Sequence, residues 1–162
     1  MPDDPNDPSD PTEAGVPSTK GATRTYEAER IRVLWDASRC IHSANCLNAL
    51  PEVFDTRRRP WVDVHAAGAE EIAAAVRTCP TGALRYVGLG GLPDEESDSP
   101  PVIGIDPRGP LLVRGRVQVR DTRGRVLADE HRLALCRCGA SANKPFCDNS
   151  HRRIGFRDDA PR

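Results

Sequence analysis

With 162 residues and a hydrophobic fraction of 38% that includes only 4% aromatic residues, the chain is poorly supplied for one large core. The formal net charge is -1 and charges of both signs are mixed along the chain, which excludes the basic face of a nucleic-acid-binding protein. Runs of about 18 apolar residues, which a membrane span needs, are also absent. We therefore expect no nucleic-acid or membrane partner. Two small domains fit this composition better than one large domain. Domains below about 70 to 80 residues usually need a disulfide, a metal or a partner to be stable.

The cysteines indicate metal or cluster ligation in a reducing compartment. The first residues are acidic and rich in proline, without the basic start and apolar segment of a secretory signal. We therefore expect a cytoplasmic protein whose thiols stay reduced, where cysteine patterns favour ligation over disulfides. The thiols fall into two groups of three, which are Cys40, Cys46 and Cys79, and Cys136, Cys138 and Cys147.

The chain begins with a segment that cannot fold by itself. Residues 1–24 repeat Asp-Pro and small polar residues, and so few apolar groups cannot offset the entropy of ordering. We expect a disordered tail there. From residue 25 the pattern changes, and Ile31, Val33 and Trp35 alternate with other residues, which predicts a strand over 30–35 with these three on one face.

The segment between this strand and the next strong pattern is expected to be mostly loop. A short helix is predicted over residues 44–50, because Pro51 disfavours the helical conformation in the residue before it. The arginine-rich residues 57–60 read as a loop, and residues 61–64 as a short extended piece.

Residues 67–80 carry the clearest helical pattern in the chain. Alanines favour a helix, two glutamates occupy its first turn, and a proline closes it. Ile72, Val76 and Cys79 form one inward stripe, and a strand is expected to return over residues 84–87. A cysteine on such a stripe can be a plain core residue, but the Cys-Pro sequence that follows argues for a ligand.

Residues 26–88 resemble the divergent single-cluster 4Fe-4S ferredoxin family, through the cysteine pair near the start and the Cys-Pro after the helix. The resemblance implies a small ferredoxin-like α/β unit over residues 25–90. It also implies that one iron-sulfur cluster is held by Cys40, Cys46 and Cys79.

The chain departs from the ferredoxin pattern at one ligand position. Where the ordinary bacterial run has a further cysteine, this chain has Ser43, whose hydroxyl is a poor iron ligand. The cluster is then either a 3Fe-4S cluster on the three cysteines or a 4Fe-4S cluster with another fourth ligand. His42 is the nearest candidate, and a solvent-facing loop histidine is the alternative.

The second half begins after a linker over residues 91–101, which is rich in glycine, proline and acidic residues. Over residues 102–162 short runs carry apolar residues at alternate positions, and residues 121–124 form a hairpin turn that ends in glycine. These features predict a small antiparallel β unit whose last strand leads directly into Cys136. The expected fold class is therefore α+β.

The stretch CRCGASANKPFCDNSH, from Cys136 to His151, holds three cysteines and a histidine and almost no apolar residue. Thiolate and imidazole suit iron-sulfur clusters, zinc or copper, and a one-residue gap between the first two cysteines makes zinc less suitable without excluding it. Residues 102–157 closely resemble the CDGSH iron-sulfur family. That resemblance implies a 2Fe-2S cluster on Cys136, Cys138, Cys147 and His151.

One position departs from the CDGSH pattern, since Asn149 stands where the family has glycine. We expect a left-handed backbone there, which asparagine tolerates best among the other residues. Asp148 is interpreted as an N-cap that orients the loop. Lys144 either approaches the cluster or is a solvated lysine.

The sequence shows no acid-base pair, nucleotide-binding loop or activated nucleophile, so we expect no enzyme. The leading hypothesis is a single-electron carrier with two clusters, a 2Fe-2S cluster and a 4Fe-4S or 3Fe-4S cluster, which serves a redox partner protein. Two alternatives stay open: an iron-sulfur sensor or cluster-transfer protein, and a structural zinc-binding module. The chain is expected to be a monomer or a homodimer.

Overall fold

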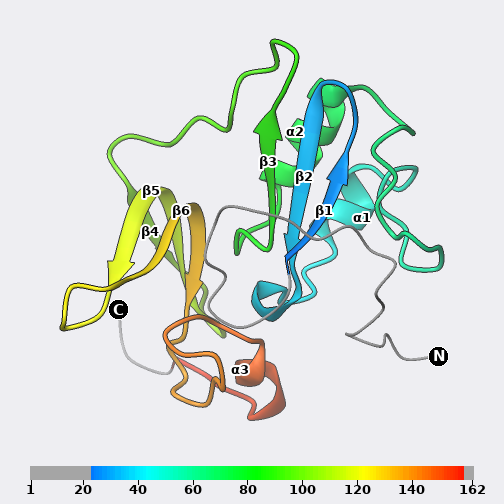
Figure 1. Ribbon diagram of the computed structural model, residues 1–162. Coiled ribbons are helices and arrows are strands. Elements are labelled where there is room, and N and C mark those ends of the chain that lie inside the picture. Colours follow the sequence, from blue (N-terminus) through cyan, green and yellow to red (C-terminus); the bar gives the residue numbers. More distant parts are fainter. Residues whose placement is uncertain (1–22, 159–162) are drawn as a thin grey trace.

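A computed structural model describes residues 23–158 of the chain. The predicted tail over residues 1–24 lies outside the described residues except for Thr23 and Arg24, which already belong to a strand. Over the described range the chain forms two antiparallel sheets of three strands each, with short helices around them (Figure 1). The predicted α+β class is confirmed. No helix in this range is both long enough and apolar enough to cross a membrane.

The elements follow one another in chain order, and each sheet keeps its strands in that order. The first sheet contains β1 (Thr23–Glu27), β2 (Ile31–Asp36) and β3 (Leu84–Gly88), and the second contains β4 (Val102–Ile105), β5 (Leu111–Arg120) and β6 (Val126–Leu135). The helices are the 3-10 helix η1 (Ala37–Arg39) and the α-helices α1 (Asn45–Ala49), α2 (Ala69–Arg77) and α3 (Ser150–Arg153).

The first core lies between the first sheet and α2. Ile31 and Val33 of β2 are fully buried, as are Ile72 and Val76 of α2, so the predicted alternation and the predicted stripe are both confirmed. Helix α2 packs across one face of the sheet (Figure 1). Strand β1 was not predicted, because Tyr26 is its only buried residue and gives no periodic signal.

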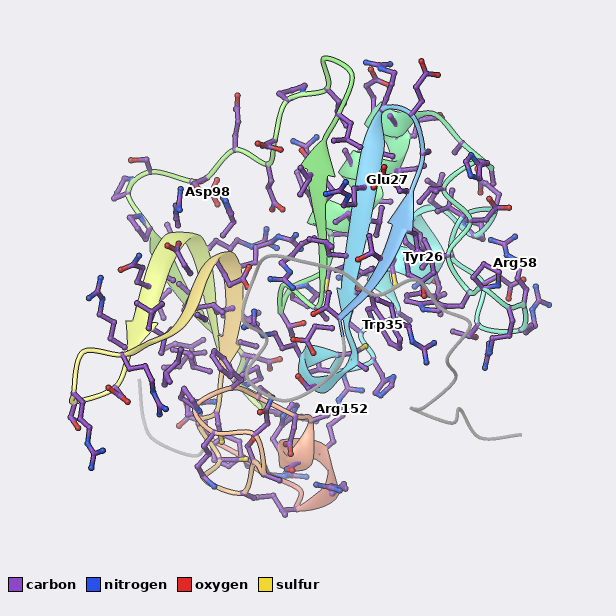
Figure 2. The ribbon with its side chains drawn as sticks, viewed as in Figure 1. Tyr26, Glu27, Trp35, Arg58, Asp98 and Arg152 are labelled. Atoms are coloured by element: carbon purple, nitrogen blue, oxygen red, sulfur yellow. The ribbon has the colours of Figure 1, made fainter. Side chains whose placement is uncertain are left out.

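The region between β2 and α2 is mostly irregular, as expected. The predicted helix over residues 44–50 is present as α1, and the extended piece over residues 61–64 forms only one isolated bridge, between Phe54 and Val62. Figure 2 places Arg58 in the loop at the outer edge of this half and Asp98 in the segment that joins the two sheets.

In the second half the short predicted runs form two long strands, β5 and β6. Strand β5 is continuous because it passes through a bulge, where its register with β6 shifts between Arg114 and Val117. Gly115 lies at this irregularity with φ 103°, and an added Cβ would come within 2.7 Å of Pro101 Cα. The predicted turn is confirmed, since Gly124 has φ 81° and its N–H donates to Asp121 O at 2.9 Å. Leu133 of β6 is fully buried in the small core of this sheet.

The two halves pack directly against each other through a buried arginine. Arg132 of β6 is 4% exposed, and its guanidinium donates to the carbonyl oxygens of Val76 (3.0 Å), Leu84 (3.0 Å) and Cys79 in the first half. The same guanidinium forms an ion pair with Glu95 of the linker, with N···O distances of 2.6 and 2.8 Å. A charged group at this depth is tolerated only because its donors are paired.

A second buried network lies beside the first. Glu130 of β6 is 4% exposed and accepts hydrogen bonds from Arg39 of η1, at 2.8 Å, and from Arg85 of β3. Arg39 also lies 3.5 Å from Asp36, which is itself buried. These contacts fix the second sheet against the end of the first sheet that carries η1.

Candidate metal centres

The loop after β6 brings together the cysteines and the histidine of the second half as two pairs. Cys136 Sγ lies 3.9 Å from Cys138 Sγ, and Cys147 Sγ lies 3.4 Å from His151 Nδ1. The loop folds back on its own strand, because Cys147 N–H donates to Ala134 O at 2.8 Å. Strand β6 therefore positions both ends of the motif at once.

The turn before α3 is held by two residues that the sequence singled out. Asn149 has φ 72°, which confirms the predicted left-handed backbone. Asp148 Oδ1 accepts from Ser150 N–H at 3.0 Å and its Oδ2 accepts from Ala142 N–H at 2.9 Å, so its side chain orients the loop as expected. The predicted N-cap role of Asp148 is wrong by one position. Helix α3 begins at Ser150, so its N-cap residue is Asn149. Burial raises the pKa of Asp148, but these hydrogen bonds outweigh it and lower the pKa to about 2.

The two pairs of donors differ in electrostatic environment. Burial raises the pKa of Cys136, but hydrogen bonds from backbone N–H groups and from Cys138, with the charge of Lys144, bring it below the ordinary value. Burial raises the pKa of Cys147, and it lowers the pKa of His151, with help from nearby positive charge. The imidazole is thus favoured in its neutral form, which is the form that binds metal.

Lys144 is exposed to solvent, but its ammonium group is also held by the loop. Its Nζ donates to Ser141 O at 2.7 Å, and Ser141 Oγ in turn donates to Phe146 O at 2.7 Å. The ammonium group therefore closes the loop and brings a positive charge near Cys136.

The cysteines of the first half gather around one small cavity. Cys40 follows η1, Cys46 lies in α1 and Cys79 follows α2, and all three line a cavity of about 30 Å³. Burial raises the pKa of Cys40 and raises that of Cys46 to about 11, and the proximity of Cys79 adds to both shifts. A positively charged metal group would offset this cost and stabilise the thiolate form of the cysteines at the cavity.

The loop between Cys40 and Cys46 places its two polar candidates differently. Ser43 lines the cavity of the three cysteines, whereas His42 lines a neighbouring cavity of about 230 Å³ together with Cys40 and Cys46. His42 and Ala44 have φ of 54° and 60°, a left-handed conformation that is costly for residues other than glycine. Such backbone is kept where the surrounding structure requires it, often at functional sites.

Trp61 belongs to this site although no sequence pattern indicated it. It lines both cavities beside the cysteines, and its ring packs edge-on against Trp35 at 5.0 Å. Its indole Nε1 is buried and has no hydrogen-bond partner within the described residues. A sulfur atom at the cysteine cavity could accept a hydrogen bond from this indole N–H. Only the tertiary structure brings Trp61 here, because it lies 15 residues after Cys46 in an irregular segment.

Backbone donors also reach the sulfur atoms at both sites. Leu84 N–H donates to Cys79 Sγ at 3.5 Å, and Asn149 N–H donates to Cys147 Sγ at 3.4 Å. Hydrogen bonds of this kind stabilise thiolate sulfur and raise the reduction potential of an iron-sulfur centre.

Comparisons with known proteins match each half to a family. Residues 26–88 match the family described as "Divergent 4Fe-4S mono-cluster", and residues 108–152 match the family described as "Iron-binding zinc finger CDGSH type". Two relatives of Escherichia coli, from strains K12 and O157:H7, both bear the name "Uncharacterized protein YjdI". Each is 33% identical to the chain over 66 residues, which cover 41% of the chain and 87% of the relative. Both resemblances inferred from the sequence are confirmed.

Proposed function

Because the chain belongs to the divergent 4Fe-4S mono-cluster family over residues 26–88 and carries a CDGSH-type iron-binding domain over residues 108–152, we propose that this iron-sulfur protein carries single electrons. The observation that supports this most strongly is the arrangement of soft donors in two separate groups, one in each half. Each group can hold a redox cofactor, and the one thiol–imidazole pair that the site brings together, Cys147 with His151 at 3.4 Å, consists of two of the proposed ligands. We therefore propose a carrier and not an enzyme.

The second site fits a 2Fe-2S cluster because its donors are already paired. Cys136 and Cys138 would bind one iron, and Cys147 and His151 would bind the other. Structural zinc requires four donors that converge on one ion, whereas the structure brings these four donors together as two pairs. The pairing therefore favours the cluster over the zinc-binding alternative.

The first site fits a ferredoxin-type cluster on Cys40, Cys46 and Cys79. The buried Nε1 of Trp61, which has no partner among the described residues, matches a site built around a sulfur-rich metal group. Ser43 lines the same cavity and would be the neighbouring side chain for a 4Fe-4S cluster that needs a fourth ligand, whereas a 3Fe-4S cluster would need only the three cysteines. His42 is the less favoured fourth ligand, because it lines the neighbouring cavity.

The residues around each site determine what the cluster can do. The neutral imidazole of His151 replaces a thiolate, which removes negative charge and makes an added electron easier to accept. Hydrogen bonds to sulfur and the charge of Lys144 act in the same direction. The second site is therefore expected to have the higher reduction potential of the two.

The decisive experiment is anaerobic purification followed by counts of iron and acid-labile sulfide per chain. Visible absorption and electron paramagnetic resonance then show whether both clusters form and accept electrons from dithionite. Oxidation of the reduced protein by a one-electron acceptor protein is the expected final step. A protein without a reducible cluster in either half would refute the proposal, and a colourless protein that contains zinc would establish the structural alternative.

Cluster transfer is the second candidate, and the site's single histidine ligand favours it. Imidazole can leave the metal by protonation, so a cluster held partly by His151 is easier to release than one held by four thiolates. Incubation of the loaded protein with an apo-ferredoxin distinguishes the two functions, since a carrier keeps its iron and a donor loses it.

The setting we propose for this carrier is the cytoplasm. All six cysteines are free thiols, which agrees with a reducing compartment. The partner we propose is a redox protein, with the chain acting as a monomer or a homodimer.

A further inference from the structure

The two cysteine groups meet at the interface between the halves. Ile41, which follows Cys40 in the chain, forms one buried apolar cluster with Ala134 and Cys147 of the second half. Ile41 is 8% exposed and Cys147 is 3% exposed, so water is excluded from the contact. One small apolar cluster thus connects the neighbour of a first-site ligand to a ligand of the second site.

The residue on the other side of Cys40 also reaches across. The guanidinium of Arg39 lies over the ring of Phe146 at 4.8 Å, and Phe146 directly precedes Cys147. Arg39 is held in this place by its ion pair with Glu130 at 2.8 Å. Asn143 adds a hydrogen bond from its Nδ2 to Ser38 O at 3.1 Å. Both neighbours of Cys40 are therefore docked on the loop that carries Cys147.

A third contact fixes the other end of the first site. Arg132 of β6 donates to the carbonyl oxygen of Cys79, and its other donors are occupied by Val76, Leu84 and Glu95. Because the guanidinium is planar and rigid, it fixes the distance between β6 and the Cys79 turn. The second sheet is thus attached to both ends of the first cysteine group.

We propose that the Ile41–Ala134–Cys147 cluster is the electronic contact between the two sites, and that Arg39 and Arg132 are positioning residues that fix their separation. This inference rests on the proposed function and deepens it. The first site of the same chain is the redox partner of the second site. A purely structural interface would not need to bury ligand-bearing loops against each other. Contacts between the sheets alone would stabilise the pair of domains.

The direction of transfer follows from the ligands. A one-electron reductant, such as a reduced flavoprotein or dithionite, supplies the electron to the first site. One electron then leaves the first site, which returns to its oxidised state, and enters the second site, where an imidazole in place of a thiolate makes reduction easier. No bond is formed or broken in this step.

Electron paramagnetic resonance of the full-length protein with both clusters loaded tests the proximity. With both sites reduced, we expect the signal of the second site to broaden and to relax several-fold faster than in the Cys79→Ser variant, which lacks the first cluster. Signals that merely add, as if the sites were far apart, would overturn the inference while leaving the proposed function intact. Failure of the sites to be reduced would instead refute the proposed function, and the inference with it.

Photoreduction with a flavin, followed by absorption at the two sites, tests the route. In the natural protein we expect transfer between the sites at a rate independent of protein concentration, and a several-fold slower rate in Ile41→Ala. The matched control is Val64→Ala, since Val64 is 6% exposed in the first core and outside the contact. An Ile41→Ala rate equal to that of the control, or a rate proportional to protein concentration, would exclude this contact as the route. Ile41→Val provides a milder variant with the same expected direction if the alanine variant does not fold.

Discussion

At the scale of single residues, the two sites differ in how their sulfur atoms are stabilised. Cys79 receives a backbone hydrogen bond from Leu84, and Cys147 receives one from Asn149. The first site also has a donor without a partner among the described residues, the indole nitrogen of Trp61. Donors that stabilise negative charge on sulfur favour the reduced form of a cluster.

Substitution of Trp61 by phenylalanine is therefore expected to lower the reduction potential of the first site. The ring is retained, so the packing against Trp35 and Phe54 changes little. The lost hydrogen bond is worth about 1 kcal/mol of preference for the reduced state. A redox titration of the loaded protein measures the shift. The control is Trp35→Phe, and equal potentials in the two variants would contradict a hydrogen bond from Trp61.

Replacement of His151 by cysteine is expected to make the second site more stable in mild acid. The pKa of His151 is lowered by burial, so its neutral form is stabilised in the folded chain. That stabilisation is complete above the ordinary histidine value of about 6.5 and is lost as the pH falls through the lowered pKa. A protonated imidazole cannot bind metal. The decay of visible absorption at low pH should thus be slower in His151→Cys than in the natural protein, and equal rates would contradict the role of the imidazole.

At the scale of elements, both sites lie in loops whose backbone adopts unusual conformations beside regular strands and helices. Asn149 is left-handed immediately before α3, and His42 and Ala44 are left-handed in the loop that leads into α1. Loops of this kind direct several N–H groups toward one point, which suits them to hold an anionic group. The strands and α2 then serve as the rigid support for these loops.

Asn149→Gly and Asn149→Val are expected to change stability in opposite directions. Glycine adopts φ 72° without strain and removes a buried side-chain oxygen that has no partner in the part of the chain that the structure describes, so a gain of about 0.5 to 1 kcal/mol is expected. Valine in the left-handed region costs about 1 to 2 kcal/mol. Denaturant unfolding of the metal-free protein measures both. A loss of stability in the glycine variant would show that the asparagine side chain has a role in the loop.

At the scale of the whole molecule, the two halves behave as one packed body joined at the cysteine sites. Gly82, in the turn after Cys79, lies so close to β6 that an added Cβ would come within 2.4 Å of Arg132 O. This contact is between backbones, so it cannot be relieved by a change of rotamer. The approach of β6 therefore depends on a glycine in the first half.

Gly82→Ala is accordingly expected to separate the halves or to unfold the chain. Its φ of 68° adds strain of about 1 to 2 kcal/mol, and the clash with the carbonyl oxygen adds more. The matched control is Gly124→Ala, where φ is 81° but the space around an added Cβ is open. Thermal unfolding should show a much larger loss for Gly82→Ala, and similar losses in the two variants would contradict a tight approach at this turn.

The sequence by itself determined the local elements and the ligand motifs, because these depend on short-range patterns. Alternation predicted β2 and the alanine-rich stripe predicted α2, whereas the ligands of the second site and the left-handed Asn149 were implied by the resemblance of residues 136–151 to the CDGSH family. Strand β1 and the merging of the short runs into β5 and β6 were missed, since edge strands and bulges leave weak periodic signals.

Only the tertiary structure decided which of these parts meet. The placement of Trp61 and Ser43 at the first cavity, and of His42 outside it, follows from a loop path that no local pattern encodes. The docking of Arg132 on the Cys79 turn joins residues that lie 53 positions apart. Contacts at such separations are fixed by the packing of two sheets and by the need to pair every buried charge, and these are properties of the folded chain as a whole.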